Sequence, residues 1–280
     1  MTGRTVVITG ATSGIGQVAA IRLAERGARI IFIARDAGRA RATLARLEAA
    51  GPGRAHAFHL ADLSVIAEMK RVGAVIAACE PRIDVLINNA GALFSARSRT
   101  ADGLGASFAT NHLAYFVLTL QLLGRLQATA GARIVCTSSD AHQRGRIDFD
   151  RLQRNGLGGY AQSKLANLLF VRRLAQLLGA SGVTVNALHP GFVATRFGDN
   201  SGAGWRTLLR CWKALAGLPP ETGAATLIYL AAAPALAGRS GGYYVRCELA
   251  EPSARARSDD DALRLWQISA QLTGLDCPPA

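Results

Sequence analysis

The stretch Thr9-Gly-Ala-Thr-Ser-Gly-Ile-Gly16 decides the fold of this chain of 280 residues. It follows an apolar run, Arg4–Thr9, and precedes Gly16–Arg26, where apolar residues recur at helical spacing. Its three glycines suit a tight turn that a pyrophosphate approaches closely, because a Cβ would obstruct the turn, the anion and the packing of helix on strand. The N-terminus of the helix would then offer unpaired N–H groups to the anion. The opening of the chain therefore predicts a dinucleotide-binding α/β fold.

The rest of the chain alternates short apolar runs with helix-like segments. Short, fully apolar strands separated by helices are typical of a parallel sheet covered on both faces. Right-handed crossovers then give a doubly wound, mostly parallel Rossmann-type sheet. Without a linker or an internal repeat, residues 1–280 are predicted to form one domain with a small helical lid at about 196–220. Further strands are expected at 28–34, 55–60, 85–88, 132–137 and 183–188, and further helices at 37–50, 64–79, 106–126, 160–178 and 259–273.

Composition narrows the class of protein. With 50% hydrophobic and 18% charged residues the chain is not expected to be disordered. It has no run of about 20 apolar residues and no secretory signal, so we expect a cytoplasmic protein without a transmembrane segment. The five cysteines and five histidines lack disulfide and zinc spacings, so no metal site is expected. The net charge of +13 comes from scattered arginines, which argues against a nucleic-acid partner.

Four motifs, taken in order, resemble those of the short-chain dehydrogenase/reductase superfamily. They are the TGxxxGIG loop quoted above, Asn88-Asn-Ala-Gly91, Tyr160-Ala-Gln-Ser-Lys164 and Pro190-Gly-Phe-Val-Ala-Thr195. Together they cover residues 3 to about 197. The resemblance implies an oxidoreductase that uses a nicotinamide nucleotide to interconvert a carbonyl and an alcohol.

The resemblance also implies which residues bind the cofactor. Most follow the strands of the expected sheet, and two belong to the YxxxK pair. These positions are Gly10, Thr12, Ser13, Gly14, Ile15, Gly16, Asp62, Leu63, Asn89, Ala90, Gly91, Tyr160, Lys164, Pro190, Gly191, Val193 and Thr195.

Arg35, at the end of the second strand, bears on the choice between NADP and NAD. An acidic residue there would bond the adenosine ribose and repel a 2′-phosphate, whereas an arginine can bind the phosphate with a charge-assisted fork. Arg39 could assist from the next helical turn, and Asp36 could still face the ribose. We therefore expect NADP(H) to be preferred over NAD(H).

The YxxxK pair carries the expected chemistry. Tyr160 and Lys164 are one helical turn apart, and a nearby ammonium lowers the pKa of a tyrosine from about 10, which makes it a general acid or base. By resemblance, Lys164 also holds the nicotinamide ribose and Ser139 holds the substrate oxygen, with Ser138 as the alternative. Asn111 resembles the family's fourth catalytic residue, which supports a water path to the lysine.

Two further stretches resemble the retinol dehydrogenase-like branch of the family. They are Ala141–Leu152 (AHQRGRIDFDRL) and Leu263–Leu275 (LRLWQISAQLTGL). A lid with an apolar and basic helix at Trp205–Leu215 suits a lipophilic substrate, although that helix could instead contact a membrane or an anionic carrier. The resemblance also suggests a homodimer or homotetramer packed through the helices at 106–126 and 160–178.

Two other functions stay open at this point. The same scaffold could run another nicotinamide-dependent reaction, such as epimerisation or dehydration. It could also belong to a non-catalytic, nucleotide-sensing protein. Such proteins usually lose part of the catalytic group, which is complete here. His142, three residues after Ser139, is expected in a structural or solvent-facing role, with substrate contact as the alternative.

Overall fold

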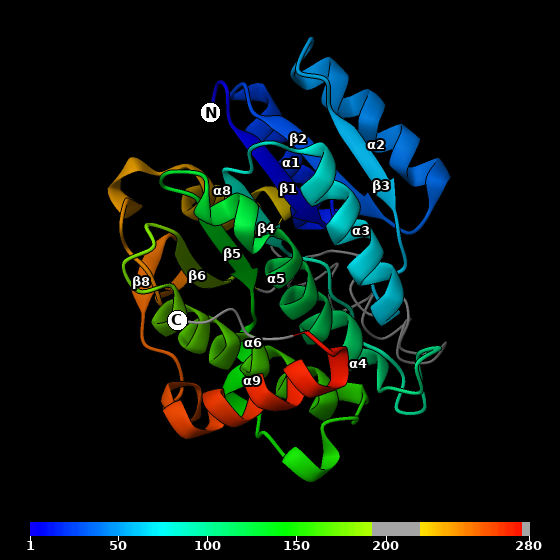
Figure 1. Cartoon of the computed structure of the whole chain (residues 1–280), viewed down its shortest axis with the longest axis vertical. Helices are drawn as coiled ribbons and strands as arrows, with labels where there is room; N and C mark the ends of the chain where they lie inside the picture. The colour runs from blue at the N-terminus through cyan, green and yellow to red at the C-terminus, as the bar shows by residue number, and fades with distance from the viewer. Residues whose placement is uncertain (192–218, 276–280) are drawn as a thin grey trace.

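The computed structural model describes residues 1–191 and 219–275 (Figure 1). Its centre is an eight-stranded sheet in the order β3-β2-β1-β4-β5-β6-β7-β8, parallel except for β8, which pairs antiparallel with β7. The doubly wound, mostly parallel fold is therefore confirmed. The strands are β1 (Thr5–Thr9), β2 (Arg29–Ala34), β3 (Ala57–Leu60), β4 (Val85–Asn88), β5 (Arg133–Thr137), β6 (Thr184–His189), β7 (Tyr243–Val245) and β8 (Glu248–Ala250).

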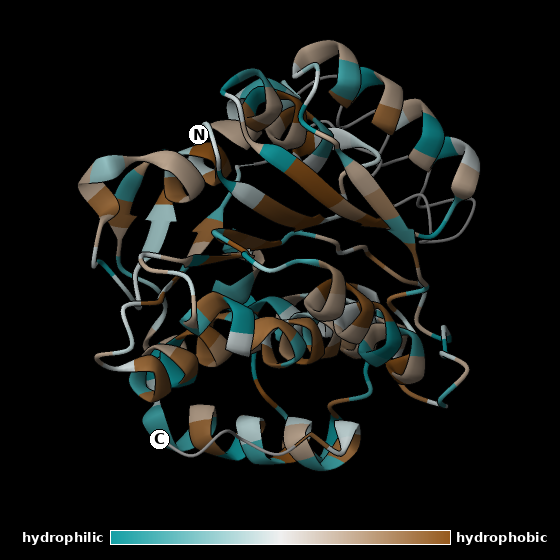
Figure 2. Ribbon diagram, turned by 45° about the horizontal axis from the view of Figure 1, so that its top comes forward, coloured by the Kyte–Doolittle hydropathy of each residue, from teal (hydrophilic) through white to brown (hydrophobic). Residues whose placement is uncertain are grey.

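Helices cover both faces of the sheet, and the apolar strands lie between the two layers (Figure 2). One layer consists of α1 (Gly14–Glu25), α2 (Ala37–Ala50) and α8 (Pro220–Ala232). The other consists of α3 (Ile66–Cys79), α5 (Ala114–Gln127) and α6 (Gly156–Leu178), with α9 (Asp259–Thr273) packed on α6. None of the helices within the described ranges is long and apolar enough to cross a membrane.

Most predicted elements differ from the observed ones by one or two residues at an end. The exceptions are α6, which begins at Gly156 rather than Tyr160, and the elements α8, β7 and β8, which were not predicted. The helix expected at 106–126 is interrupted: α4 (Ala106–Phe108) continues into a π-helix, Ala109–Leu113, before α5 begins. Such bulges frequently lie at functional sites. The expected lid lies outside the described residues except for 219 and 220.

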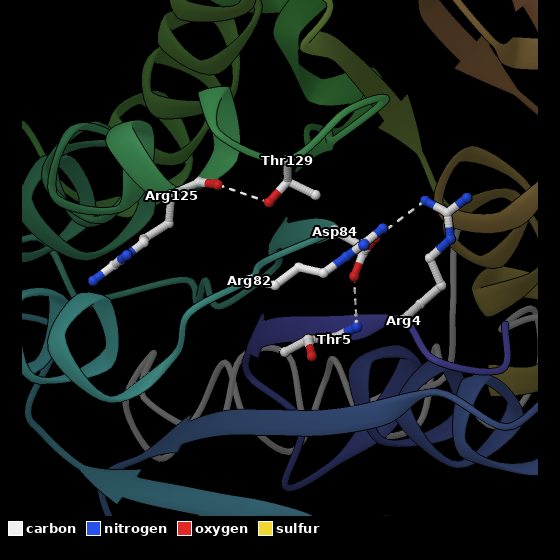
Figure 3. Close-up of polar contacts among 6 residues, drawn as sticks. All are labelled: Arg4, Thr5, Arg82, Asp84, Arg125 and Thr129. Carbon is white, nitrogen blue, oxygen red and sulfur yellow. Dashed lines mark hydrogen bonds and ion pairs between the residues drawn. The ribbon is translucent and has the colours of Figure 1, made fainter.

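The amino ends of the central strands are joined by ion pairs around one carboxylate. Asp84 is fully buried and accepts hydrogen bonds from Arg4 Nη1 at 3.2 Å, Arg82 Nη2 at 2.7 Å and the Thr5 N–H at 2.9 Å (Figure 3). In the same view, the Thr129 hydroxyl caps α5 by donating to the Arg125 carbonyl. These contacts stabilise the amino end of the sheet, and the candidate site lies at the opposite, carboxyl end.

The outer faces of the two long helices are covered within the same chain. Every residue of α6 from Ala161 to Val171 is buried. Trp266 of α9 stacks on Phe170 of α6 with ring centroids 5.8 Å apart, and meets Phe116 of α5 at 5.0 Å. The faces of these two helices under α9 are therefore covered within the chain, and copies of the chain that join through the two helices have to use the parts that α9 leaves open.

Candidate active site

The loops after β1 and β4 are fastened to each other at the carboxyl ends of the strands. The Thr9 hydroxyl accepts the N–H groups of Asn89 and Ala90, both at 2.9 Å, and Asn89 Nδ2 donates to the Thr9 carbonyl at 3.0 Å. The strand order reverses direction between β1 and β4. A reversal of this kind is where doubly wound folds bind nucleotides.

The glycines of the first loop make room for Asn89. Gly10 has φ +72°, and a Cβ there would lie 2.8 Å from Asn89 Nδ2. A Cβ on Gly16 would collide with the same nitrogen and with the Gly10 carbonyl. Gly14, with φ +57°, takes the left-handed turn into α1. Packing against Asn89 therefore requires glycine at positions 10 and 16, whether or not a ligand is bound.

The start of α1 fits an anionic group. Ser13 is the N-cap residue with extended backbone, but its side chain makes no capping hydrogen bond, and the first turn holds no acidic residue. The first N–H groups of a helix have no partner within it, and the helix dipole adds positive potential there. Thr12, Ser13 and Ile15 are only partly buried, so this loop can accept the pyrophosphate of a dinucleotide.

The end of β2 presents one arginine to solvent. Arg35 is exposed, and it forms no ion pair within residues 1–191 and 219–275. Asp36 instead caps α2 by accepting the Arg39 N–H at 2.8 Å, which lowers the pKa of its carboxyl group. Arg39 also lies 3.6 Å from this carboxylate. Asp36 and Arg39 therefore pair with each other, and the guanidinium group of Arg35 is available to a ligand.

The two residues after β3 differ in exposure. Asp62 is partly buried and accepts the Ser64 N–H at 3.0 Å, which shapes the turn. The Leu63 side chain belongs to the core. If Leu63 contacts a nucleotide, it does so through its backbone.

Asn111 lies on the π-helix and is fully buried. Its Oδ1 accepts the Ala92 N–H at 2.9 Å, and its Nδ2 donates to the Ala92 carbonyl at 3.0 Å and to Ser163 Oγ at 3.1 Å. A Cβ on Gly91 would lie 3.2 Å from Asn111 Oδ1 and 3.3 Å from Lys164 Nζ. The loop after β4 is therefore pressed against both Asn111 and Lys164.

Lys164 is 3% exposed and donates from Nζ to the Thr137 carbonyl at 3.0 Å. Burial lowers the pKa of its ammonium to about 8. Its Nζ lies 5.6 Å from the ring centroid of Tyr160 and 5.9 Å from that of Tyr115. The lysine is a cation at neutral pH, close to both aromatic rings.

The pKa of Tyr160 is raised to about 12 by burial, and a hydrogen bond with the Ser139 side chain acts in the opposite direction. The prediction that the neighbouring ammonium lowers this pKa is therefore wrong for this arrangement, since Lys164 is turned toward the Thr137 carbonyl. Tyr160 is a neutral phenol at neutral pH, which makes it a proton donor.

The two candidate serines are used differently. Ser138 is buried and donates from Oγ to the Lys164 carbonyl at 2.8 Å. Ser139 is partly exposed, lies beside Tyr160 and accepts the Ala141 N–H at 3.2 Å. The structure thus brings Ser139, and not the Ser138 hydroxyl, to the tyrosine.

His142 and His189 hold the loops around the site. The ring of His142 is buried and lies between the Ser139 carbonyl, 2.7 Å from Nδ1, and the Ser253 N–H, 3.2 Å from Nε2. His189 Nδ1 accepts the Asp140 N–H at 3.1 Å. The structural alternative for His142 is therefore the one observed. Its link to Ser253, far along the chain, had no signal in the sequence.

The loop after β6 is described only at its start. Pro190 and Gly191 follow β6, and Gly191 has φ +86°. Val193 and Thr195, both predicted to bind the cofactor, lie outside the described residues. Among the residues that are described, no group of three or more His, Cys, Asp or Glu side chains could hold a metal ion.

A glycine loop at a strand reversal, with a serine, a tyrosine and a lysine gathered beside it, defines a nucleotide-dependent oxidoreductase of the Rossmann type. Residues 4–204 match the family model described as short chain dehydrogenase, so the chain belongs to the short-chain dehydrogenase/reductase family of NAD(P)-dependent enzymes. It is similar to human retinol dehydrogenase 13, with 40% identity over 290 residues that cover 99% of this chain and 86% of that protein.

Solved structures agree with the assignment. An uncharacterised protein from Mycobacterium paratuberculosis superposes with a TM-score of 0.79 at 32% identity, over 99% of this chain and 96% of that one. A short-chain dehydrogenase from Burkholderia cenocepacia in complex with NADP has a TM-score of 0.69 at 28% identity, over 92% of this chain and 99% of that one.

Proposed function

We propose that this enzyme uses NADP(H) to interconvert a lipophilic carbonyl compound and its alcohol. The observation that carries the proposal is the position of the neutral Tyr160 phenol, which is hydrogen-bonded to Ser139 and lies close to Lys164. The name of the human retinol dehydrogenase relative supports a lipophilic substrate, and the Burkholderia neighbour, solved with NADP, supports the cofactor.

Tyr160 is proposed to move the proton. When bound, a nicotinamide nucleotide would supply hydride to a carbonyl carbon or accept it from an alcohol. Tyr160 would donate its phenolic proton to the substrate oxygen during reduction, because a pKa of about 12 keeps it protonated at neutral pH. The Ser139 hydroxyl would hold the same oxygen in place by a hydrogen bond.

Lys164 and Asn111 are proposed to support that transfer. An ammonium that turned from the Thr137 carbonyl toward Tyr160 would lower the pKa of the tyrosine and favour the reverse, oxidising direction. Lys164 would also hold the nicotinamide ribose. Asn111, which fixes the Ala92 backbone next to the lysine, would support a water path to it.

The cofactor is proposed to lie across the carboxyl ends of β1 and β4. Arg35 would hold the 2′-phosphate, and the start of α1 would hold the pyrophosphate. Asp62, Leu63 and the loop after β4 would face the adenosine side, and Pro190, Gly191, Val193 and Thr195 would face the nicotinamide. The loop glycines and the uncapped start of α1 fit this placement.

An assembly of two or four copies is also proposed, through surfaces other than the covered faces of α5 and α6. One such surface is the edge strand β8, whose Leu249 is 65% exposed. Unpaired strand edges readily join another chain. Light scattering of the wild type and of Leu249→Glu tests this: a smaller mass for the variant supports the edge, and an unchanged oligomer excludes it. The proposed membrane contact through Trp205–Leu215 concerns a segment outside the described residues.

Loss of NADPH absorbance, followed with aldehydes and ketones from short chains to retinal, tests the function. Turnover concentrated on long lipophilic carbonyls is expected, together with loss of turnover and near-normal NADPH binding in Tyr160→Phe. Tyr229→Phe, on α8, is the matched control and keeps activity. A Tyr160→Phe enzyme with normal turnover would refute the assigned role. Product formation without net use of NADPH would indicate epimerisation or dehydration instead.

A further inference from the structure

A chain of buried side chains connects α9 to the carbonyl that holds Lys164. Ser269 Oγ of α9 lies 3.0 Å from His112 Nε2, and His112 Nδ1 lies 3.4 Å from Asn167 Oδ1. Asn167 Nδ2 then donates to the Thr137 carbonyl at 3.3 Å. That carbonyl is the one that accepts Lys164 Nζ at 3.0 Å. One oxygen atom therefore serves two donors, the lysine and the amide.

The direction of these hydrogen bonds follows from the groups at the two ends of the series, the Thr137 carbonyl and the Ser269 hydroxyl. Asn167 has to present its NH₂ group to the Thr137 carbonyl, so its Oδ1 faces His112. Burial lowers the pKa of His112 to about 4, which leaves one N–H on a neutral ring. That proton belongs on Nδ1, where it donates to Asn167 Oδ1. Nε2 then accepts from the Ser269 hydroxyl, whose proton is shared with the Leu265 carbonyl 2.8 Å away, and the His112 Nδ1–H and the Asn167 NH₂ group both point toward Thr137.

Burial and aromatic packing hold these hydrogen-bonded side chains in place. His112 is 1% exposed, and Asn167 and Ser269 are fully buried. The His112 ring lies 5.1 Å from the Phe108 ring and meets Phe170 edge-on at 6.2 Å. Hydrogen bonds away from water are electrostatically stronger and polarise one another. A change at Ser269 is therefore expected to reach the orientation of the Asn167 amide.

We propose that Asn167, oriented by His112 and by Ser269 of α9, is a positioning residue that shares the Thr137 carbonyl with Lys164 and so limits how tightly the lysine is held there. A carbonyl that already accepts one donor is a poorer acceptor for a second. The shared oxygen leaves the ammonium easier to turn toward Tyr160. The other titratable groups facing Lys164 are Tyr115 of α5 and Cys136 of β5.

The inference rests on the proposed function, because it concerns the lysine to which proton transfer and cofactor binding are assigned. It predicts that removing the Asn167 amide strengthens the hydrogen bond from the protonated Lys164 to the Thr137 carbonyl. The pKa of Lys164 then rises by about half a pH unit, the effect of one modest hydrogen bond.

The scarcity of lysine makes this directly measurable. The chain has three lysines, Lys70, Lys164 and Lys213, so ¹³Cε-lysine labelling gives three NMR signals, and Lys164→Arg assigns the one of interest. The pKa of Lys164 is titrated in the full-length protein for the wild type, Asn167→Ala and Ser269→Ala. Thr273→Val is the matched control, because its buried hydroxyl is on the same helix but donates only to backbone carbonyls of α9.

A rise in Asn167→Ala, a smaller rise in Ser269→Ala and no change in Thr273→Val support the proposal. No change in the first two, a fall, or an equal shift in the control overturns it. Should Asn167→Ala fail to fold, Ser269→Ala decides alone. A wild type that binds NADPH but reduces no carbonyl would count against the proposed function and leave this titration unaffected. In an active enzyme, the lysine-dependent limb of the pH profile of kcat moves with the titrated pKa.

Discussion

Lys164 and Thr137 hold each other's segments at the centre of the site. Lys164 Nζ donates to the Thr137 carbonyl at 3.0 Å, and the hydroxyl of the next residue, Ser138, donates back to the Lys164 carbonyl at 2.8 Å. The end of β5 is thus joined to α6 in both directions. Because Ser138 is occupied in this way, Ser139 is the serine proposed to meet a substrate.

Alanine substitutions at the two serines are therefore expected to have different effects, mainly on kcat at Ser139 and on stability at Ser138. Ser139→Ala is expected to lower kcat about a hundredfold, the usual effect of removing one preorganised donor, and to lower the free energy of unfolding by about 1 kcal/mol, because its Oγ also accepts the Ala141 N–H. Ser138→Ala is expected to lower the free energy of unfolding by about 1–2 kcal/mol, since it removes a buried hydrogen bond. Urea unfolding and steady-state kinetics on both variants check this. The reverse pattern would assign the substrate contact to Ser138.

Arg35→Asp is expected to reverse the cofactor preference. It removes the cation available to a 2′-phosphate and places a carboxylate where a ribose hydroxyl can be bonded. The Kd for NADPH should rise at least tenfold, while the Kd for NADH stays equal or falls. Fluorescence titration measures both. Arg41→Asp, an exposed position on α2, is the control with little effect on either. Unchanged affinities in Arg35→Asp would remove Arg35 from the binding site.

Stability is expected to fall between pH 7 and pH 5. All five histidines have a pKa lowered by burial, His112 to about 4. The unfolded chain, with histidine near 6.5, binds more protons than the folded one as the pH falls below that value. The contribution is complete above pH 6.5 and is lost as the pH falls toward the folded pKa. His112 alone accounts for about 2 kcal/mol at pH 5. Urea unfolding at both pH values measures it, and constant or rising stability on acidification would contradict it.

Tyr115→Phe is expected to leave the free energy of unfolding unchanged or raise it by up to about 1 kcal/mol. Tyr115 is fully buried, and its hydroxyl has no hydrogen-bond partner in the part of the chain that the structure describes. An unpartnered buried hydroxyl costs stability. Thr119→Val, one turn further along α5, is the contrast: its hydroxyl accepts from Asn88 Nδ2 at 3.0 Å, so about 1 kcal/mol should be lost. A comparable loss in Tyr115→Phe would mean that its hydroxyl is bonded.

Local pattern was enough to predict the fold, and it named Ser139, Tyr160 and Lys164, which the structure brings close together. Alternating apolar runs placed β1 to β6, and glycine spacing placed the loop after β1. The reason for the glycines was only partly foreseen, since Gly10 and Gly16 are confined by Asn89, which follows a strand far along the chain. The strands β7 and β8 were missed because each has three residues, too few for a periodic signal.

Contacts between distant segments could not be predicted in this way. The π-helix that carries Asn111 leaves no mark in helical periodicity. The pKa of Tyr160 depends on where the Lys164 ammonium points, and its partner is a backbone carbonyl, which no side-chain pattern records. His142 and His112 are isolated histidines in the sequence, and their partners Ser253 and Ser269 lie 111 and 157 positions away.

The contact between His112 and Ser269 also bears on how the enzyme matures during synthesis. A chain leaves the ribosome with its N-terminus first. The strands that would hold a nucleotide have all emerged once β6 is made, yet His112 Nε2 meets its partner Ser269 only when α9 follows, 157 positions after the histidine. During synthesis, the segments up to β6 therefore leave the ribosome before the residue that completes the setting of His112, and with it the setting of Asn167 beside Lys164.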